Sequence, residues 1–205
     1  KEGKVCGIDA RIFRISFTGE LSFEINVPSR YGLFVWNEFM KYGKKYDITP
    51  YGTESMHVLR AEKGFIIVGQ DTDGSVTPKD INMDWIVSKK KEDFLGKRSF
   101  SRSDTRRADR KQLVGLLVND KKTVLPEGSY VVDEAKPRPP MDMIGHVSSS
   151  YYSPTCDHPI ALALIKNGLN RMGDVVKIPL MSGKVIDATI TDSIFYDKEG
   201  ARNNE

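Results

Sequence analysis

Apolar and polar residues alternate near the start of the chain in a pattern that predicts a β-hairpin. Residues 11–17 alternate, and residues 21–27 alternate again after the Thr-Gly-Glu sequence at 18–20. Successive side chains of a strand point to opposite faces, so Glu24 should lie on the polar face. The residues expected on the buried face are Leu21, Phe23, Ile25 and Val27.

Helical spacing of apolar residues follows the hairpin. One helix is expected from about Tyr31 to Tyr42, with Ser29 as its N-cap and Gly43 at its end. A second is expected over 53–62, with Met56 and Leu59 facing inward and Gly64 as a left-handed C-terminal cap. The apolar residues 65–68 read as buried, and a third short helix is expected near 78–80.

The second half of the chain consists of short apolar runs broken by Gly, Pro and Asn. This spacing predicts a small antiparallel barrel or sandwich. The predicted strands are 113–118, 130–132, 144–147, 160–165, 175–178 and 188–190. The chain as a whole is therefore expected to be α+β, with an α+β region over 1–98, a basic connector over 99–112 and a β-barrel domain over 113–205.

Composition narrows the class of protein without defining it. The 205 residues are 39% hydrophobic and carry a net charge of +3, which is typical of a globular chain. No apolar run approaches the roughly 18 residues of a membrane span, so no membrane partner is expected. The charge is too small and too dispersed to favour nucleic acid as a partner. Two widely spaced cysteines indicate free thiols, and we expect a cytoplasmic location. Because the sequence begins without Met, we also expect it to be part of a longer protein.

Two short motifs resemble metal sites but lack the required ligands. An EF-hand loop that began at Asp71 would need Gly at the sixth position and Glu at the twelfth. Here Gly74 stands at the fourth position and Asn82 at the twelfth, which favours a simple Asp-rich turn. The sequence from Cys156 to His158 supplies too few ligands for a zinc site. No metal and no catalytic residue is predicted.

Glu24 is the most informative polar residue of the hairpin. A carboxylate on a strand can accept two parallel hydrogen bonds from a ligand with an amidine-like edge, as pterins and purines have. The alternative from the pattern alone is a solvated surface glutamate.

Three ordered motifs resemble one family. They are R-I-S-F-T-G-E-L-S-F-E at 14–24, L-R-A-E-K-G at 59–64 and G-H-V-S-S at 145–149. In this order they resemble the folate-binding aminomethyltransferases, to which the T-protein of the glycine cleavage system belongs. The resemblance implies part of the family's folate-binding domain followed by its C-terminal β-barrel.

Within the family, the resemblance is greatest to alpha subunits of heterotetrameric sarcosine oxidases. It is carried by residues 51–54, 57–74 and 109–116 and by the ending at 195–202. It implies an oxidoreductase in which flavin-bearing subunits oxidise sarcosine and this region passes the one-carbon unit to tetrahydrofolate, giving 5,10-methylenetetrahydrofolate. FAD, FMN and NAD would be held elsewhere in the assembly. A free-standing aminomethyltransferase and a non-catalytic assembly module are the alternatives.

The resemblance also implies site residues. Glu24 matches the family glutamate that grips the pterin, Phe17 matches an aromatic position beside the ligand, and Arg202 matches an arginine that can meet the carboxylate tail of folate. Trp85 and Tyr152 are expected nearby. The family's aspartate that activates the folate amine belongs to a segment preceding the hairpin, so this region alone is expected to be inactive.

Overall fold

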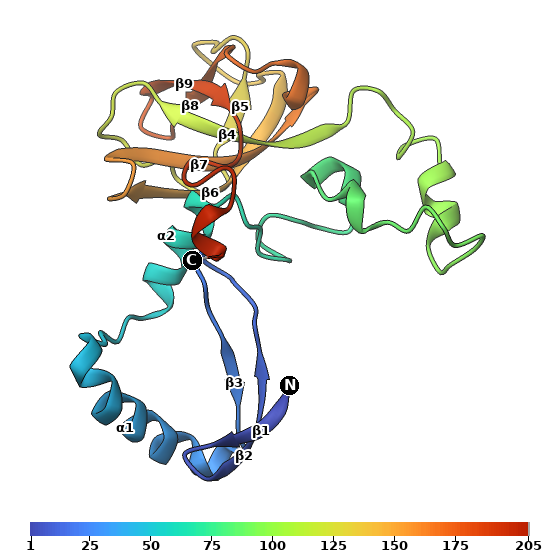
Figure 1. Ribbon diagram of the computed structural model, residues 1–205. Coiled ribbons are helices and arrows are strands. Elements are labelled where there is room, and N and C mark those ends of the chain that lie inside the picture. The colour runs from blue at the N-terminus through green and yellow to red at the C-terminus, as the bar shows by residue number, and fades with distance from the viewer. Residues whose placement is uncertain (205) are drawn as a thin grey trace.

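The computed structural model describes residues 1–204, and a closed β-barrel is its largest part (Figure 1). Its strands pair antiparallel in the order β4-β7-β6-β5-β8-β9, and pairing of β4 with β9 closes the barrel. The strands are β4 (Lys111–Val118), β5 (Tyr130–Val132), β6 (Met143–Ser153), β7 (His158–Lys166), β8 (Val175–Pro179) and β9 (Val185–Thr191). The predicted α+β class with an antiparallel barrel is confirmed.

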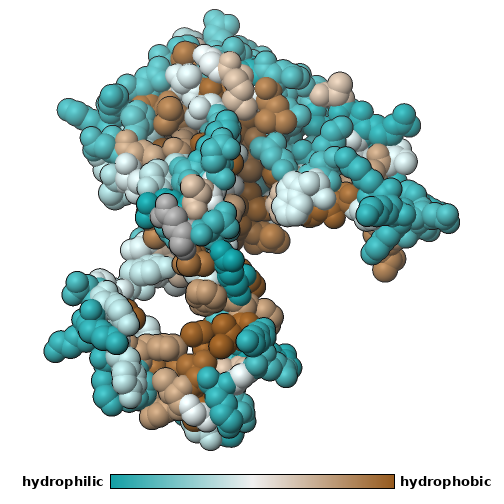
Figure 2. Space-filling view, viewed as in Figure 1, coloured by the Kyte–Doolittle hydropathy of each residue, from teal (hydrophilic) through white to brown (hydrophobic). Residues whose placement is uncertain are grey.

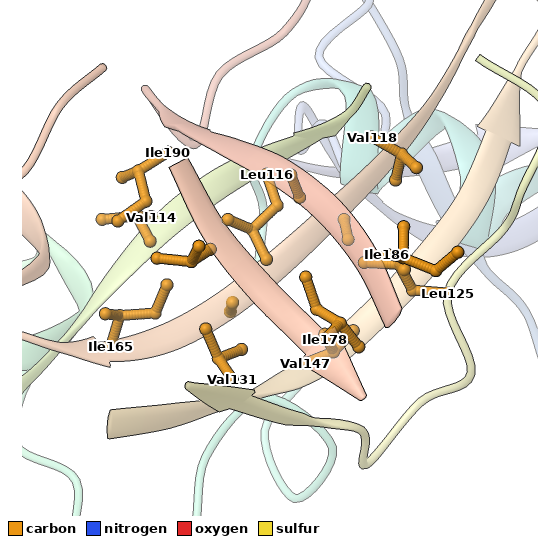
Figure 3. Packing of buried hydrophobic residues seen from close by; sticks show 14 residues of the cluster. Val114, Leu116, Val118, Leu125, Val131, Val147, Ile165, Ile178, Ile186 and Ile190 are labelled. Carbon is orange, nitrogen blue, oxygen red and sulfur yellow. The ribbon is translucent and has the colours of Figure 1, made fainter. Parts of the chain in front are cut away.

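Alternation along the strands separates two apolar clusters. On β4, Val114 and Leu116 point into the barrel, where the main core lies (Figure 3). Leu113 points outward and packs with Leu162, Leu164 and Ile81, under the segment that follows α2. Strand β7 is consequently buried on both faces, which explains why its sequence is a continuous apolar run.

The amino-terminal part is a three-stranded antiparallel sheet of β1 (Glu2–Val5), β2 (Ile8–Phe13) and β3 (Glu24–Asn26). Strand β1 was not anticipated. The predicted hairpin is β2–β3, with Ile12 opposite Ile25, but its ladder is shorter than the alternating pattern. Residues 14–23 form a long loop instead of continuing the strands.

Two predictions of burial are wrong. Leu21 and Phe23 are 40% and 57% exposed, and in the apolar run 65–68 Val68 is 84% exposed. Apolar side chains also gather on the open surface of this amino-terminal part (Figure 2). Alternation defines which side chains share a face, but that face is buried only where a second layer packs against it.

The two predicted helices are present as α1 (Gly32–Gly43) and α2 (Thr53–Glu62). Ser29 does not cap α1; it begins a 3-10 turn over Ser29–Tyr31. Gly64 has the expected left-handed conformation (φ +73°), and its amide donates to the Ala61 carbonyl at 3.0 Å. The buried residues of α2 are Arg60, Ala61 and Glu62, whereas Met56 and Leu59 are only half-buried.

Short 3-10 helices complete the described chain, at Lys44–Tyr46, Pro78–Ile81, Asp84–Ile86, Lys97–Ser101, Gly168–Asn170 and Ala201–Asn203. The third predicted helix corresponds to Pro78–Ile81, where Thr77 and Asp80 form a capping box. Arg110, in the basic connector, donates to both oxygens of Asp80 at 2.8 and 2.7 Å and so ties the connector to this helix. Within 1–204, no helix is long and apolar enough to cross a membrane.

A buried ion pair joins α2 to the barrel. The Arg60 guanidinium donates to the Asp71 carboxylate at 2.6 Å and to Ser149 Oγ, on β6, at 2.7 Å, and both charged side chains are fully buried. The hydroxyls of Ser148 and Ser149 donate to the other oxygen of Asp71 at 2.5 and 2.7 Å. Asp71, expected in a simple turn, is therefore an internal anchor. Among the buried side-chain nitrogen and oxygen atoms of residues 1–204, only Arg60 Nε has no hydrogen-bond partner.

Burial in the barrel core predicts that two Leu→Ala substitutions differ in their effect on the free energy of unfolding. Leu116→Ala should lower the free energy of unfolding by about 2–5 kcal/mol, because it leaves a cavity among residues that cannot fully collapse. Leu95→Ala removes the same atoms from a fully exposed side chain and should change it by less than about 0.5 kcal/mol. Urea unfolding of both variants measures the difference, and equal losses would contradict this assignment of the core.

The buried Arg60–Asp71 pair predicts that loss of Arg60 destabilises the chain more than loss of a surface arginine. Arg60→Met should destabilise the chain by about 3–5 kcal/mol, because the Asp71 carboxylate would remain buried without its cation. Arg107→Met is the matched control, since Arg107 pairs with Asp109 at the surface, where solvent screens the pair and its loss should change stability little. Comparable urea midpoints for the two variants would show that the Arg60–Asp71 pair is not an anchor.

Candidate functional site

Glu24 is the first residue of β3, where it lies opposite Phe13. Its side chain is exposed. Within residues 1–204 its carboxylate takes part in no hydrogen bond or ion pair, so both oxygens are available as acceptors. An exposed carboxylate without a described partner fits both the bidentate ligand contact and the solvated surface glutamate that the sequence allows, so the role of Glu24 stays a prediction.

The loop of residues 14–23 leads directly into Glu24. Internal hydrogen bonds fold the loop on itself, from Ser22 Oγ to the Ile15 carbonyl at 2.6 Å and from the Gly19 amide to Ser16 Oγ at 2.9 Å. Gly19 is left-handed (φ +85°), and a Cβ there would lie 2.7 Å from the Lys63 side chain. Glycine is thus required both by conformation and by space. Phe17 is half-buried in the same loop, and its place beside a ligand stays a prediction.

Arg202 contacts this loop from the other end of the chain. Its Nε donates to both carboxylate oxygens of Glu20, at 2.6 and 2.8 Å. Its carbonyl accepts from the Leu21 amide at 3.1 Å, and Arg14 donates to the Asn203 carbonyl at 2.8 Å. Figure 1 shows the segments flanking β2 and β3 converging at the C-terminal end of the chain. Arg202 is therefore joined through Glu20, a residue outside the predicted site, to the loop that also contains Phe17.

The C-terminal segment is in turn attached to the end of α2. Lys63 Nζ lies 3.3 Å from Asp197 Oδ2, and Asp197 accepts from the backbone amides of Ala201 and Arg202 at 3.0 and 3.2 Å. Burial opposes ionisation of Asp197, but the hydrogen bonds from the Arg202 amide and the Lys63 ammonium outweigh it. The pKa of Asp197 is consequently below its ordinary value.

The rest of the L-R-A-E-K-G motif has equally specific contacts. Glu62 accepts from Ser153 Oγ at 2.6 Å through its side chain, and its carbonyl accepts from the amides of Phe195 and Tyr196. Gly64 lies against the Ser193 carbonyl, where a Cβ would be 2.5 Å away. The motif thus joins α2 both to the barrel and to the C-terminal segment.

Tyr152 and Trp85 lie on other elements. The Tyr152 hydroxyl, on β6, donates to Asp157, and this hydrogen bond raises the pKa of Tyr152. Tyr152 also lines an open groove of about 670 Å³ together with Glu54 and His57 of α2. Trp85 is 77% exposed, in the 3-10 helix Asp84–Ile86. No hydrogen bond among the described residues joins either side chain to Glu24, so their role beside the ligand stays a prediction.

His146 and Cys156 are two further residues whose side chains are of types used in catalysis or metal binding. Burial lowers the pKa of His146, so it is expected to be neutral near pH 7. Cys156 lies in the turn between β6 and β7, and both cysteines are free thiols. Within 1–204, no three His, Cys, Asp or Glu residues are grouped as a metal site would require.

The curated relatives that the chain matches are longer than the chain. The chain is 54% identical over 202 residues to the sarcosine oxidase subunit alpha of Corynebacterium sp. (strain P-1), covering 97% of the chain and 20% of the relative. It is 36% identical over 192 residues to that of Rhizobium meliloti (strain 1021), covering 93% and 19%. It is 30% identical over 195 residues to the aminomethyltransferase of Thermoanaerobacter pseudethanolicus, covering 95% and 50%. The chain thus spans about a fifth of the first two relatives and half of the third.

A solved structure and two family models match the fold. Glycine cleavage system aminomethyltransferase T from Bartonella henselae superposes with a TM-score of 0.78 at 26% identity, covering 91% of this chain and 50% of that chain. Residues 1–91 match the GCVT N-terminal domain, and residues 111–197 match the glycine cleavage T-protein C-terminal barrel domain. Since the two matches are consecutive and together take in the hairpin, α2 and the barrel, the chain belongs to the glycine cleavage T-protein family.

Proposed function

We propose that this chain is the folate-binding region of a sarcosine oxidase alpha subunit. In this function, the one-carbon unit released from oxidised sarcosine passes to tetrahydrofolate and gives 5,10-methylenetetrahydrofolate. The observation that carries the proposal is the exposed Glu24 carboxylate, both of whose oxygens are unclaimed within 1–204. The 54% identity to a sarcosine oxidase alpha subunit supports it.

The residues around Glu24 fit the pterin end of folate. A pterin presents adjacent N–H donors, and a carboxylate accepts two such bonds in parallel, which fixes the orientation of the ring. Phe17 supplies an aromatic surface in the adjoining loop. Tetrahydrofolate itself would supply the nucleophilic amine. The contribution of this chain is to hold that amine in one orientation toward the incoming carbon, which can replace a large part of the entropic barrier of a bimolecular step.

The oxidation of sarcosine needs chemistry that we assign to other parts of the assembly. We propose that flavin-bearing subunits are the partners of this chain and that FAD, FMN and NAD are bound outside it. On this view the chain acts after the oxidation, when the one-carbon unit must reach folate before it reacts with water.

Glu24 gives the direct test of the pterin site. Glu24→Gln keeps the size of the side chain but replaces one acceptor oxygen by a donor, so tetrahydrofolate affinity should fall by about 10- to 100-fold, as expected for hydrogen bonds to a charged group. Isothermal titration calorimetry of the full chain measures the change. Glu134→Gln is the control, because Glu134 is an exposed glutamate on the barrel. Unchanged affinity in Glu24→Gln would contradict the pterin contact.

A free-standing aminomethyltransferase is the second candidate, favoured by the matches to aminomethyltransferases over half their length. A subunit-assembly module is the third, favoured by exposed apolar residues of α1 such as Leu33 and Trp36.

The native protein, purified from its own cells, should distinguish these functions. We expect flavin-bearing chains to accompany it in constant stoichiometry, detected by flavin absorbance through successive columns. Flavin-free protein that binds tetrahydrofolate would support the free-standing enzyme. Flavin-bearing partners without any folate affinity would support the assembly module.

A further inference from the structure

The contact between Arg202 and Glu20 assigns Arg202 a role different from that of a folate ligand. We propose that Arg202 is a positioning residue, which holds the loop 14–23 in the shape that presents Glu24 and Phe17 to the pterin, instead of binding the carboxylate tail of folate. This inference rests on the proposed folate function. We call the loop-binding residues 196–203 the C-terminal latch.

The loop depends on contacts from outside itself. Residues 14–23 form no ladder with a neighbouring strand, so the backbone bonds that fix a strand do not fix this segment. The latch supplies bonds in their place: Glu20 receives Arg202 Nε on both oxygens, and the Leu21 amide donates to the Arg202 carbonyl. The side chain of Arg202 thus holds Glu20, and its backbone carbonyl holds Leu21.

The latch is itself held rigidly. The Asp197 carboxylate accepts from the Arg202 amide at 3.2 Å and pairs with Lys63, whose side chain also packs against Gly19. The Arg202 guanidinium lies 5.9 Å from the centre of the Tyr196 ring. Lys63 therefore contacts both the loop and the latch, and Arg202 projects from a fixed base.

The pair commits one nitrogen of Arg202 to the loop. Nε of Arg202 is shared between the two oxygens of Glu20, at 2.6 and 2.8 Å. To receive the carboxylate tail of folate with that nitrogen, Arg202 would have to release Glu20, and the loop beside Glu24 would lose its side-chain anchor. If Arg202 binds the tail, its loss should weaken only ligands that have the tail. If Arg202 anchors the loop, its loss should weaken ligands with and without the tail equally.

The test compares two ligands in the full chain: tetrahydrofolate and the tail-less 6-methyltetrahydropterin. Arg202→Gln should weaken both by the same factor, about tenfold for the loss of one coupled pair. Glu20→Gln should do the same, and the double variant should be no worse than either single one. The charge-swapped pair Glu20→Arg with Arg202→Glu should recover part of the affinity. Arg106→Gln removes the same charge from another exposed arginine, in the basic connector, and is the control.

Hydrogen exchange of the amides of residues 17–22 gives a readout that needs no ligand. It should accelerate in Arg202→Gln and in Glu20→Gln but not in Arg106→Gln. Loss of tetrahydrofolate affinity alone, with unchanged pterin affinity and unchanged exchange, would overturn the proposal and make Arg202 a tail ligand. If the parent chain binds neither ligand, the folate function fails instead; accelerated exchange would then still support the latch, and unchanged exchange would overturn it.

Discussion

The Arg60 guanidinium and the Asp71 carboxylate lie 2.6 Å apart with no exposure to solvent, and the position of α2 on the barrel follows from them. Neither charge can be left in the interior alone, so the helix, the segment after it and β6 must meet in one arrangement that brings both together with Ser149. The net stabilisation is smaller than the short distance suggests, because both groups gave up their water. What the pair supplies is a defined orientation of the last turn of α2.

That last turn is also the point from which the candidate site is organised. Arg60 faces the barrel, Glu62 binds Ser153 and the backbone at 195–196, and Lys63 reaches Asp197 and Gly19. A single short motif thus relates the barrel, the C-terminal segment and the loop that precedes Glu24. The barrel therefore determines, through this motif, where the loop 14–23 lies.

Periodicity predicted the elements whose environment repeats regularly. The six barrel strands and α2 lie where the pattern predicts them, because each strand has an interior face and Gly64, with φ above zero, follows α2. Strand β6 (Met143–Ser153), however, continues well beyond the predicted 144–147. Periodicity did not predict burial where burial depends on a second layer, as for Phe23 and Val68. It also did not predict strand β1, which is only four residues long. The resemblance singled out Glu24 and Arg202, but no local pattern could reveal that Glu20 and Arg202 meet across 182 positions, since that contact exists only once the chain has folded.

The same separation has a consequence for the order in which the protein is made. On the ribosome, the loop at 14–23 emerges long before its anchor, and every strand of the barrel is synthesised between them. Closing so long a segment has an entropic cost that only a nearly complete barrel can offset. During translation the loop 14–23 therefore lacks its contacts with residues 202–203 at first, and it acquires them as a late event, after the barrel has closed and brought the C-terminal segment back to it.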